Sequence, residues 1–252
     1  MNTENLLRID DLDAPIYRIF PLQRVQELFQ KRKLVLVNPG KWEDPFENFL
    51  LSRDGVDVDG STVSFRRLAD SWFGQCWTTN SDTDAMWRIY SHDMQSLRVK
   101  TTVGKLAKYL WDPDDKFSSL KYFIGKVRYF PREEIEEFLG SASFSELALG
   151  GQNQGFAETL LAKRLEFEHE SEVRVLTCEI DSDKASQLSG LYKVAVDPHD
   201  LVDEICIDPR LLDPFDVECL EKKVRRFGYQ GELTQSDLYS VDLPTVPLSP
   251  TP

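Results

Sequence analysis

Apolar residues recur along the chain with two periods, and each period predicts one kind of element. In the segment "LQRVQELFQK" the apolar positions are Leu22, Val25, Leu28 and Phe29. This spacing of three to four residues places them on one face of a helix. Short apolar runs at residues 17–20 and 34–37 flank the segment and predict strands. The first part of the chain is therefore expected to fold as strand, helix and strand.

The same two patterns continue toward the C-terminus in an irregular order. Helical periodicity predicts further helices at residues 63–72, 81–90, 103–111, 132–139, 153–165 and 215–226. Apolar and β-branched runs predict strands at residues 73–80, 96–102, 122–130, 167–180, 191–196 and 201–208. Because helices and strands interleave without a regular repeat, the predicted class is α+β, with a mixed, largely antiparallel sheet and flanking helices.

One domain accounts for most of the chain. The 252 residues are enough for one large domain, and no Gly/Ser-rich or Pro-rich linker interrupts their middle. We expect an N-terminal extension at residues 1–14, a single α+β domain at 15–229, and a Pro-rich flexible tail at 230–252. The tail ends in "SVDLPTVPLSPTP", a composition that does not form a packed core.

The segment "FEHESEVR" places charged residues on alternate positions, at Glu168, Glu170, Glu172 and Arg174. In a strand these side chains would share one face, with neighbours roughly 7 Å apart. Like charges at that distance raise one another's pKa or require a nearby cation. In a cleft, the pair Glu170 and Glu172 could bind sugar hydroxyls, stabilise a developing cation, or act as acid and base. The alternative is an exposed strand face whose counterions are Arg174 and Lys163.

Arg18, at the start of the first strand, is a second candidate. Its planar guanidinium suits a phosphate or a carboxylate. The alternative is a structural ion pair with an acid of the segment "KWEDPFEN", which follows a turn at residues 38–40 and carries Glu43, Asp44 and Glu47. That segment is itself interpreted as a loop that covers the core and pairs with arginines, rather than as a loop that holds substrate.

The segment "CWTTNSDTDAMWRIYS" ends a predicted strand and begins a predicted helix. Thr78 and Thr79 lie at the end of the strand, where their hydroxyls could bind a ligand or the neighbouring strand. Ser81 and Asp82 are residue types that cap helix N-termini. Met86, Trp87 and Tyr90 are predicted to lie in the core.

Charge and composition weigh against several classes of function. The net charge of −13 opposes passive binding to nucleic acid. The N-terminus has no basic segment followed by an apolar one, and no run of about 18 apolar residues occurs. We therefore expect a cytoplasmic protein with no membrane partner.

Cysteines and histidines give no pattern of a metal site. The cysteines are Cys76, Cys178, Cys206 and Cys219, and the histidines are His92, His169 and His199. None has the close spacing of a metal or redox motif, so the thiols are interpreted as reduced and buried. The chain also lacks a G-x-S-x-G elbow, a Walker-type loop and an H-E-x-x-H helix.

Taken in order, "LVNPGKWEDPFEN", "DAMWRIYS" and "LAKRLEFEHESEVRVL" resemble a bacterial family defined as a domain of unknown function. Its signature is an Asp-Pro-Phe-Glu loop, a Met-Trp-x-x-Tyr helix and a Glu-x-Glu-x-Arg strand. The resemblance runs from about residue 15 to residue 212. Glu43 stands where this family has an asparagine, and the family implies no activity.

The order of an arginine on the first strand, a hydroxyl-rich strand and a late Glu-x-Glu is similar to that in ADP-ribosyltransferases. The resemblance implies that NAD is the cofactor and that Arg18 holds its phosphate or ribose. Thr78 and Thr79 would support the nicotinamide pocket. Glu172 would bind the ribose and stabilise positive charge as the glycosidic bond breaks, and Glu170 would orient or deprotonate a protein or nucleic-acid acceptor.

Two other hypotheses compete with the transferase. In the first, the chain is a non-catalytic interaction module of a bacterial stress or phage-defence system, and the acids form a structural network or a docking face. In the second, the acids bind a metal in a nuclease, which requires more converging carboxylates than the sequence provides. The transferase resemblance also has one departure, because "CWTT" at residues 76–79 stands in place of a Ser-Thr-Ser pattern.

Overall fold

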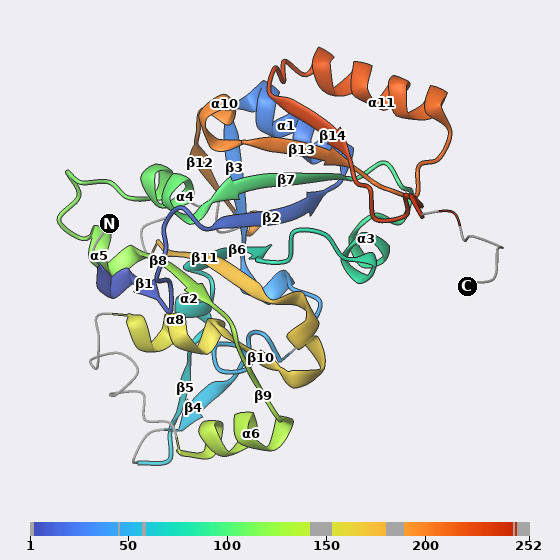
Figure 1. Ribbon diagram of the computed structural model, residues 1–252. Coiled ribbons are helices and arrows are strands. Elements are labelled where there is room, and N and C mark those ends of the chain that lie inside the picture. Colours follow the sequence, from blue (N-terminus) through green and yellow to red (C-terminus); the bar gives the residue numbers. More distant parts are fainter. Residues whose placement is uncertain are drawn as a thin grey trace.

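The computed structural model describes residues 3–44, 46–56, 59–141, 153–179, 189–243 and 245. Across these residues, ten strands form one mixed sheet with helices around it (Figure 1). Its strands are β1 (Leu6–Leu7), β2 (Pro15–Phe20), β3 (Lys33–Val37), β6 (Trp72–Thr78), β7 (Leu97–Thr102), β8 (Tyr122–Lys126), β11 (Glu172–Cys178), β12 (Leu191–Ala195), β13 (Glu204–Ile207) and β14 (Glu232–Gln235). Two short sheets pair β4 (Asp54–Val56) with β5 (Thr62–Ser64), and β9 (Arg128–Phe130) with β10 (Ala162–Arg164).

Helices cover the sheet on both sides. The described helices are α1 (Leu22–Lys31), α2 (Arg66–Ala69), α3 (Asp84–Tyr90), α4 (Val103–Leu110), α5 (Ser118–Lys121), α6 (Arg132–Ser141), α8 (Gln154–Leu160), α10 (Pro198–Leu201) and α11 (Pro214–Arg226). The 3-10 helices are η1 (Thr3–Asn5), η2 (Pro39–Lys41) and η3 (Leu165–Glu170). In the main sheet β1 pairs with β8 and β13 with β14 in parallel, and the other pairs are antiparallel. The predicted α+β class with a mixed, largely antiparallel sheet is confirmed.

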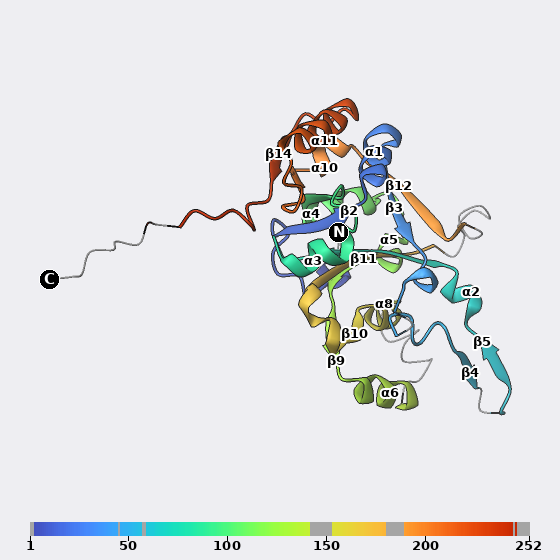
Figure 2. The same cartoon turned by 90° about the vertical axis from the view of Figure 1, so that its right-hand side faces the viewer.

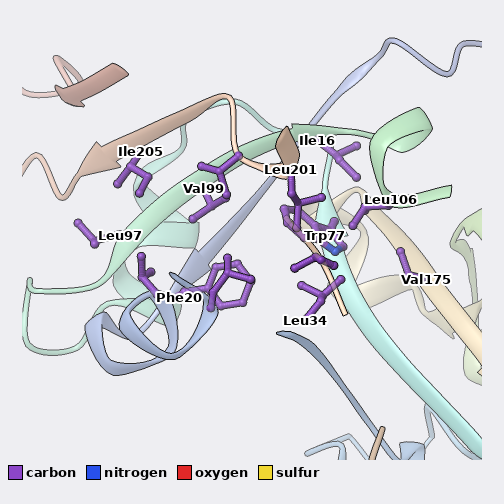
Figure 3. Packing of buried hydrophobic residues seen from close by; sticks show 14 of the residues in the cluster. Ile16, Phe20, Leu34, Trp77, Leu97, Val99, Leu106, Val175, Leu201 and Ile205 are labelled. Carbon is purple, nitrogen blue, oxygen red and sulfur yellow. The ribbon is translucent and has the colours of Figure 1, made fainter. Parts of the chain in front are cut away.

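The central strands are buried on both faces. Successive side chains of a strand point to opposite sides, and Val175 of β11 lies in one core while Leu176 lies in the other. The Val175 side packs against α1, α4, α10 and α11. Here the rings of Phe20 and Trp77 meet edge to face at 5.9 Å (Figure 3). The Leu176 side packs against α8.

The sheet forks at β6. The order of strands is β1-β8-β11-β6-β2-β7-β13-β14, and β12 and β3 branch from it. One edge of β6 pairs along its whole length with β11. The other edge pairs with β2 only at Tyr17↔Thr78 and with β3 only at Val37↔Gly74. The backbone of Cys76 therefore faces the gap between the two branches, which we call the β6 fork.

Local predictions hold where one face of an element meets the core. Helix α1 buries Val25, Leu28 and Phe29, as its periodicity predicts. Helix α3 begins later than predicted, because Thr83 rather than Ser81 or Asp82 is its N-cap and accepts from the N–H of Met86 at 3.3 Å. The predicted helix at 63–72 is wrong beyond α2, since β5 and β6 take its two ends.

The strand predicted at residues 167–180 is also wrong at its beginning. Residues 165–170 form η3, and Ser171 then adopts a left-handed conformation with φ 44° before β11 begins at Glu172. Alternating acids do not encode such a turn, because it depends on contacts with distant segments. As a result, Glu168 is exposed and does not share a face with Glu172.

Both ends of the chain contribute strands to the sheet. β1 pairs with β8, and the buried Asn5 amide donates to the carbonyls of Ser119 and Tyr122 at 2.7 and 2.8 Å. β14 pairs with β13, and the segment after it leads away past α3 (Figure 2). Residues 244 and 246–252 of the predicted tail lie outside the described residues. None of the described helices has the length and apolar character needed to span a bilayer.

Candidate functional site

Three neighbouring strands bring the predicted site residues together. Arg18 lies on β2, Thr78 ends β6, and Glu172 begins β11. The register pairs Tyr17 with Thr78 and Thr78 with Glu172. Segments separated by many residues in the sequence therefore meet where these strands lie side by side.

A buried group of charges surrounds Glu172. It consists of Glu47, Lys163, Glu170, Glu172 and Arg174, and we call it the Lys163 cluster. The Lys163 ammonium lies 2.7 Å from Glu47 Oε1 and 2.8 Å from Glu172 Oε1, and it also contacts Glu170 Oε2. No side chain of the cluster is more than 8% exposed. Charges this deep in a protein are retained only when they are paired.

Arg174 is the second cation of the cluster and is fully buried. Its Nε donates to Glu172 Oε2 at 2.6 Å, and its Nη2 to Glu47 Oε1 at 3.0 Å. Its Nη1 donates to the carbonyl of Leu160 at 2.7 Å. The guanidinium also lies over the ring of Trp42, 4.6 Å from the centroid. Each of its nitrogens therefore has a partner.

The predicted counterions are correct, and the predicted exposure is not. Lys163 pairs with Glu170 and Glu172, and Arg174 pairs with Glu172, so both are counterions as the alternative interpretation of this segment holds. The acids, however, are buried rather than on an exposed strand face. The sequence does not predict this burial, because the residues that cover the acids come from the loop of Glu47 and from η3, two segments that are far apart in the sequence.

The two neighbouring carboxylates have opposite pKa shifts. Burial alone would raise the pKa of Glu172, but the charges of Arg174 and Lys163 outweigh it and hold that pKa well below its usual range. Burial and the adjacent Glu172 raise the pKa of Glu170 to about 7, against the opposing effect of Lys163. Near neutral pH Glu172 is thus ionised, and Glu170 exchanges a proton.

Two tyrosines complete this environment. The Tyr90 hydroxyl donates to Glu170 Oε1 at 3.2 Å. The Tyr129 hydroxyl accepts from the backbone N–H of Glu172 at 2.8 Å. Burial raises the pKa of Tyr90, and raises that of Tyr129 to about 12, so both phenols stay neutral. The prediction that Tyr90 belongs to the core is wrong, because the residue is 40% exposed, although its hydroxyl contacts the buried Glu170.

The threonines hold the turn that carries Glu170. The Thr78 hydroxyl donates to the carbonyl of Glu170 at 2.6 Å and accepts from the N–H of Asn80 at 3.0 Å. The Thr79 hydroxyl donates to the carbonyl of Ser171 at 3.3 Å. Both hydroxyls therefore bind neighbouring backbone in this conformation.

Arg18 extends into the β6 fork. Its Nη1 donates to the carbonyl of Cys76, and its guanidinium lies over the ring of Phe20. Its buried Nε has no hydrogen-bond partner among the described residues. Burial lowers the pKa of Arg18, and the nearby Cys76, Tyr90 and Glu172 counteract that shift.

Over the described residues, Arg18 does not form the structural ion pair that was its alternative role. Asp44 pairs with Arg164, and Glu47 pairs with Lys163 and Arg174. Within the described ranges, Arg18 forms no ion pair with either acid. The loop at residues 41–48 does pair with basic residues, as predicted, but with ones from β10 and β11.

A small hollow adjoins Arg18. Its lining includes Arg18, Thr78, Asn80, Asp82, Trp87 and Arg98. The free volume is about 10 Å³, whereas ligand pockets usually measure about 300–1,000 Å³. Asp82 closes one side, since it accepts from Trp87 Nε1 at 2.6 Å and pairs with Arg98 at 3.3 Å.

Thiols near the site are protonated. Burial raises the pKa of Cys76 to about 12 and that of Cys178 to about 11, so both thiols are protonated near neutral pH. In the part of the chain that the structure describes, no group of three or more His, Cys, Asp or Glu residues is arranged to hold a metal ion.

No protein-family model matches the chain, and no curated protein sequence matches it. Among solved structures, the chain is similar to DarT of Thermus sp. 2.9 in complex with NAD+, with 13% identity and a TM-score of 0.41 over 90% of this chain and 96% of that one. The same protein with ADP-ribosylated ssDNA gives 11% identity and a TM-score of 0.41, covering 91% and 97%. With carba-NAD+ it gives 12% and 0.39, covering 90% and 97%. An activity for this chain has to rest on its own residues.

Proposed function

We propose that this chain is an ADP-ribosyltransferase-like enzyme that uses NAD. Glu172 and Glu170 are its catalytic carboxylates, and Arg18, Thr78 and Thr79 lie on the cofactor side. The observation that carries the proposal is the adjacency of β2, β6 and β11, with Tyr17, Thr78 and Glu172 in register. The charge of Glu172 also acts on Arg18, so guanidinium and carboxylate belong to one electrostatic environment.

The state of Glu172 suits this chemistry. Bound NAD supplies a glycosidic bond whose cleavage develops positive charge on the ribose. An ionised carboxylate fixed beside that charge stabilises it without having to reorganise. Glu172 is held in that form by Arg174 and Lys163. Glu170, with a pKa of about 7, has the proton affinity of a general base at neutral pH.

Arg18 offers a hydrogen-bond donor for NAD, whereas the space for NAD depends on a movement of the chain. Arg18 has an unpartnered N–H on Nε, which suits a phosphate or ribose oxygen. The hollow beside it holds about 10 Å³. Glu170 and Glu172 do not line this hollow, and we expect residues 80–83, which do, to move away from β2 when NAD binds, with loss of the contacts of Asp82 with Trp87 and Arg98.

The setting is part of the same proposal. We assign the enzyme to a bacterial cytoplasm, with a protein or a nucleic acid as acceptor. In the competing hypothesis, an interaction module of a stress or phage-defence system, the acids form a structural network or a docking face. Glu170 and Glu172 are only 4% and 6% exposed, which does not favour a docking face.

NAD binding and consumption test the proposal. NAD should raise the melting temperature of the purified protein and should increase hydrogen exchange at residues 80–83. NAD should be consumed in the presence of cell extract. Glu172→Gln should abolish consumption, while Glu168→Gln, an exposed change only a few residues away, should not.

Folding of the variants is checked by circular dichroism. If Glu172→Gln does not fold, Arg18→Gln replaces it and should weaken NAD binding. Wild-type protein that neither binds nor consumes NAD would overturn the proposed function.

A further inference from the structure

The Lys163 cluster contains more carboxylates than cations. Three acids, Glu47, Glu170 and Glu172, face two bases, Lys163 and Arg174. One carboxylate therefore lacks a full countercharge in a region almost closed to water. Such a group lowers its cost of burial by binding a proton.

The contacts are unequal, and the inequality identifies that carboxylate. Glu172 uses one oxygen for Lys163 and the other for Arg174. Glu47 also contacts both cations, through Oε1. Of the two cations, Glu170 contacts Lys163 alone; its other oxygen accepts from the neutral hydroxyl of Tyr90, and a side-chain hydrogen bond joins Glu170 to Glu172.

We propose that Lys163 is a positioning residue that stabilises the charge of both Glu170 and Glu172, and that Arg174, which contacts Glu172 and not Glu170, leaves the exchangeable proton of the cluster on Glu170. The roles of the two carboxylates in catalysis rest on the proposed function. The distribution of the proton between them does not, because it follows from the contacts of the protein alone.

The backbone places Lys163 for this task. It lies on β10, and η3 then returns the chain so that Glu170 and Glu172, seven and nine residues later, reach the same ammonium. The left-handed Ser171 separates the two acids and directs them to Lys163 from two elements. The ring of Phe167 lies 4.6 Å from the ammonium and covers it.

The other groups near the two carboxylates do not replace Lys163. The titratable and charged residues that act on Glu170 or Glu172 from neighbouring elements are Lys163, Glu47, Arg174, Arg18, Cys76, Tyr90 and Tyr129. The phenols and the thiol are neutral near pH 7. Arg174 contacts Glu47 and Glu172, and its ion pairs do not include Glu170. Lys163 is thus the cation shared by both catalytic candidates.

Carboxyl titrations of the full chain without NAD test this inference. Glutamate labelled with ¹³C at the side-chain carboxyl is followed by NMR against pH, and Glu170→Gln and Glu172→Gln assign the two signals. In wild type, Glu170 should titrate near pH 7, and Glu172 should stay ionised below the ordinary range. In Lys163→Met both midpoints should move upward by about 1–3 pH units, because a neighbouring positive charge is lost.

Two further variants keep the test decisive. Lys163→Arg retains the charge, so its midpoints should remain closer to wild type than those of Lys163→Met. If Lys163→Met does not fold, Lys163→Met/Glu47→Gln should recover folding, because it removes one cation together with a carboxylate that does not carry the exchangeable proton. Lys222→Met, at an exposed pair with Glu218, is the matched control and should change neither midpoint.

The outcomes separate this inference from the proposed function. Glu170 titrating in the ordinary carboxyl range, midpoints unchanged in Lys163→Met, or no recovery in the double variant would overturn the role of Lys163. Absence of NAD consumption in wild type overturns the proposed function, and the titrations still decide on Lys163. If NAD is consumed, the pH at which kcat/KM reaches half its maximum should shift upward in Lys163→Met.

Discussion

Among the groups of described residues that combine a carboxylate, a cation and a tyrosine, the Lys163 cluster and one on the surface of α3 differ most usefully in burial. The Lys163 cluster is at most 8% exposed. On the surface of α3, Asp84 pairs with Arg88 at 2.8 Å, and Tyr239 donates to the same carboxylate. There the acid and base side chains are 50% and 61% exposed. We call this second group the α3 surface cluster.

The difference in burial decides how strongly the same contacts affect stability and protonation. Water screens the α3 surface cluster and solvates each partner when the other leaves. In the Lys163 cluster no water replaces a lost partner, so removal of one group leaves an uncompensated buried charge. The buried cluster can therefore tune a proton and constrain the fold, and the exposed one contributes little to either.

Removal of a buried cation should have the largest effect on stability. Arg174→Met leaves Glu172 and Glu47 with Lys163 alone, and the free energy of unfolding should fall by about 3–5 kcal/mol. Urea unfolding followed by circular dichroism measures the loss. A change smaller than about 1 kcal/mol would mean that water reaches the cluster and that the contrast with the surface is not real.

The pH dependence of stability should show an intermediate effect with two limbs. From about pH 4.5 to about 7, folded Glu170 keeps a proton that the unfolded chain releases, so stability should fall as the pH rises. Below pH 4.5 the unfolded chain takes up a proton that folded Glu172 does not, so stability should fall as the pH drops. Melting temperatures across this range measure both limbs.

Glu170→Gln sharpens that measurement. It should flatten the fall between pH 4.5 and 7 and preserve the fall at acid pH, since glutamine does not titrate and Glu172 remains. A variant that keeps the upper limb would assign it to another group and contradict the pKa of about 7.

The smallest effect is expected at the surface. Arg88→Met and Tyr239→Phe remove contacts of the α3 surface cluster, and their melting temperatures should equal that of wild type. Added salt should not separate them from wild type. A loss comparable to that of Arg174→Met would show that the α3 surface cluster has a structural role that its exposure does not indicate.

Periodicity predicted much of this fold because it reports which face of an element meets a core. The stripe of α1 and the strands at 17–20 and 34–37 follow from that rule. The charged segment at 165–171 does not, since its alternating acids satisfy the pattern of a strand while distant groups bend it into η3. Local spacing contains no information about Lys163, Glu47 or the turn at Ser171.

The same limit applies to the site. The order of Arg18, Thr78 and Glu172 in the sequence was sufficient to group them, because their strands lie side by side in the sheet. Burial of the acids and the role of Tyr90 were not predictable. They depend on how η3 and α3 pack against the ends of β6 and β11, which is a property of the assembled fold.

The contact between Glu47 and Arg174 joins positions 127 residues apart. Closing so long a loop costs entropy before any contact offsets it. A fragment that ends before residue 163 contains Glu47 but neither Lys163 nor Arg174, the two cations that contact it. During synthesis, Glu47 must therefore stay hydrated until most of the polypeptide has emerged. The charges of the interior are balanced only when folding is complete.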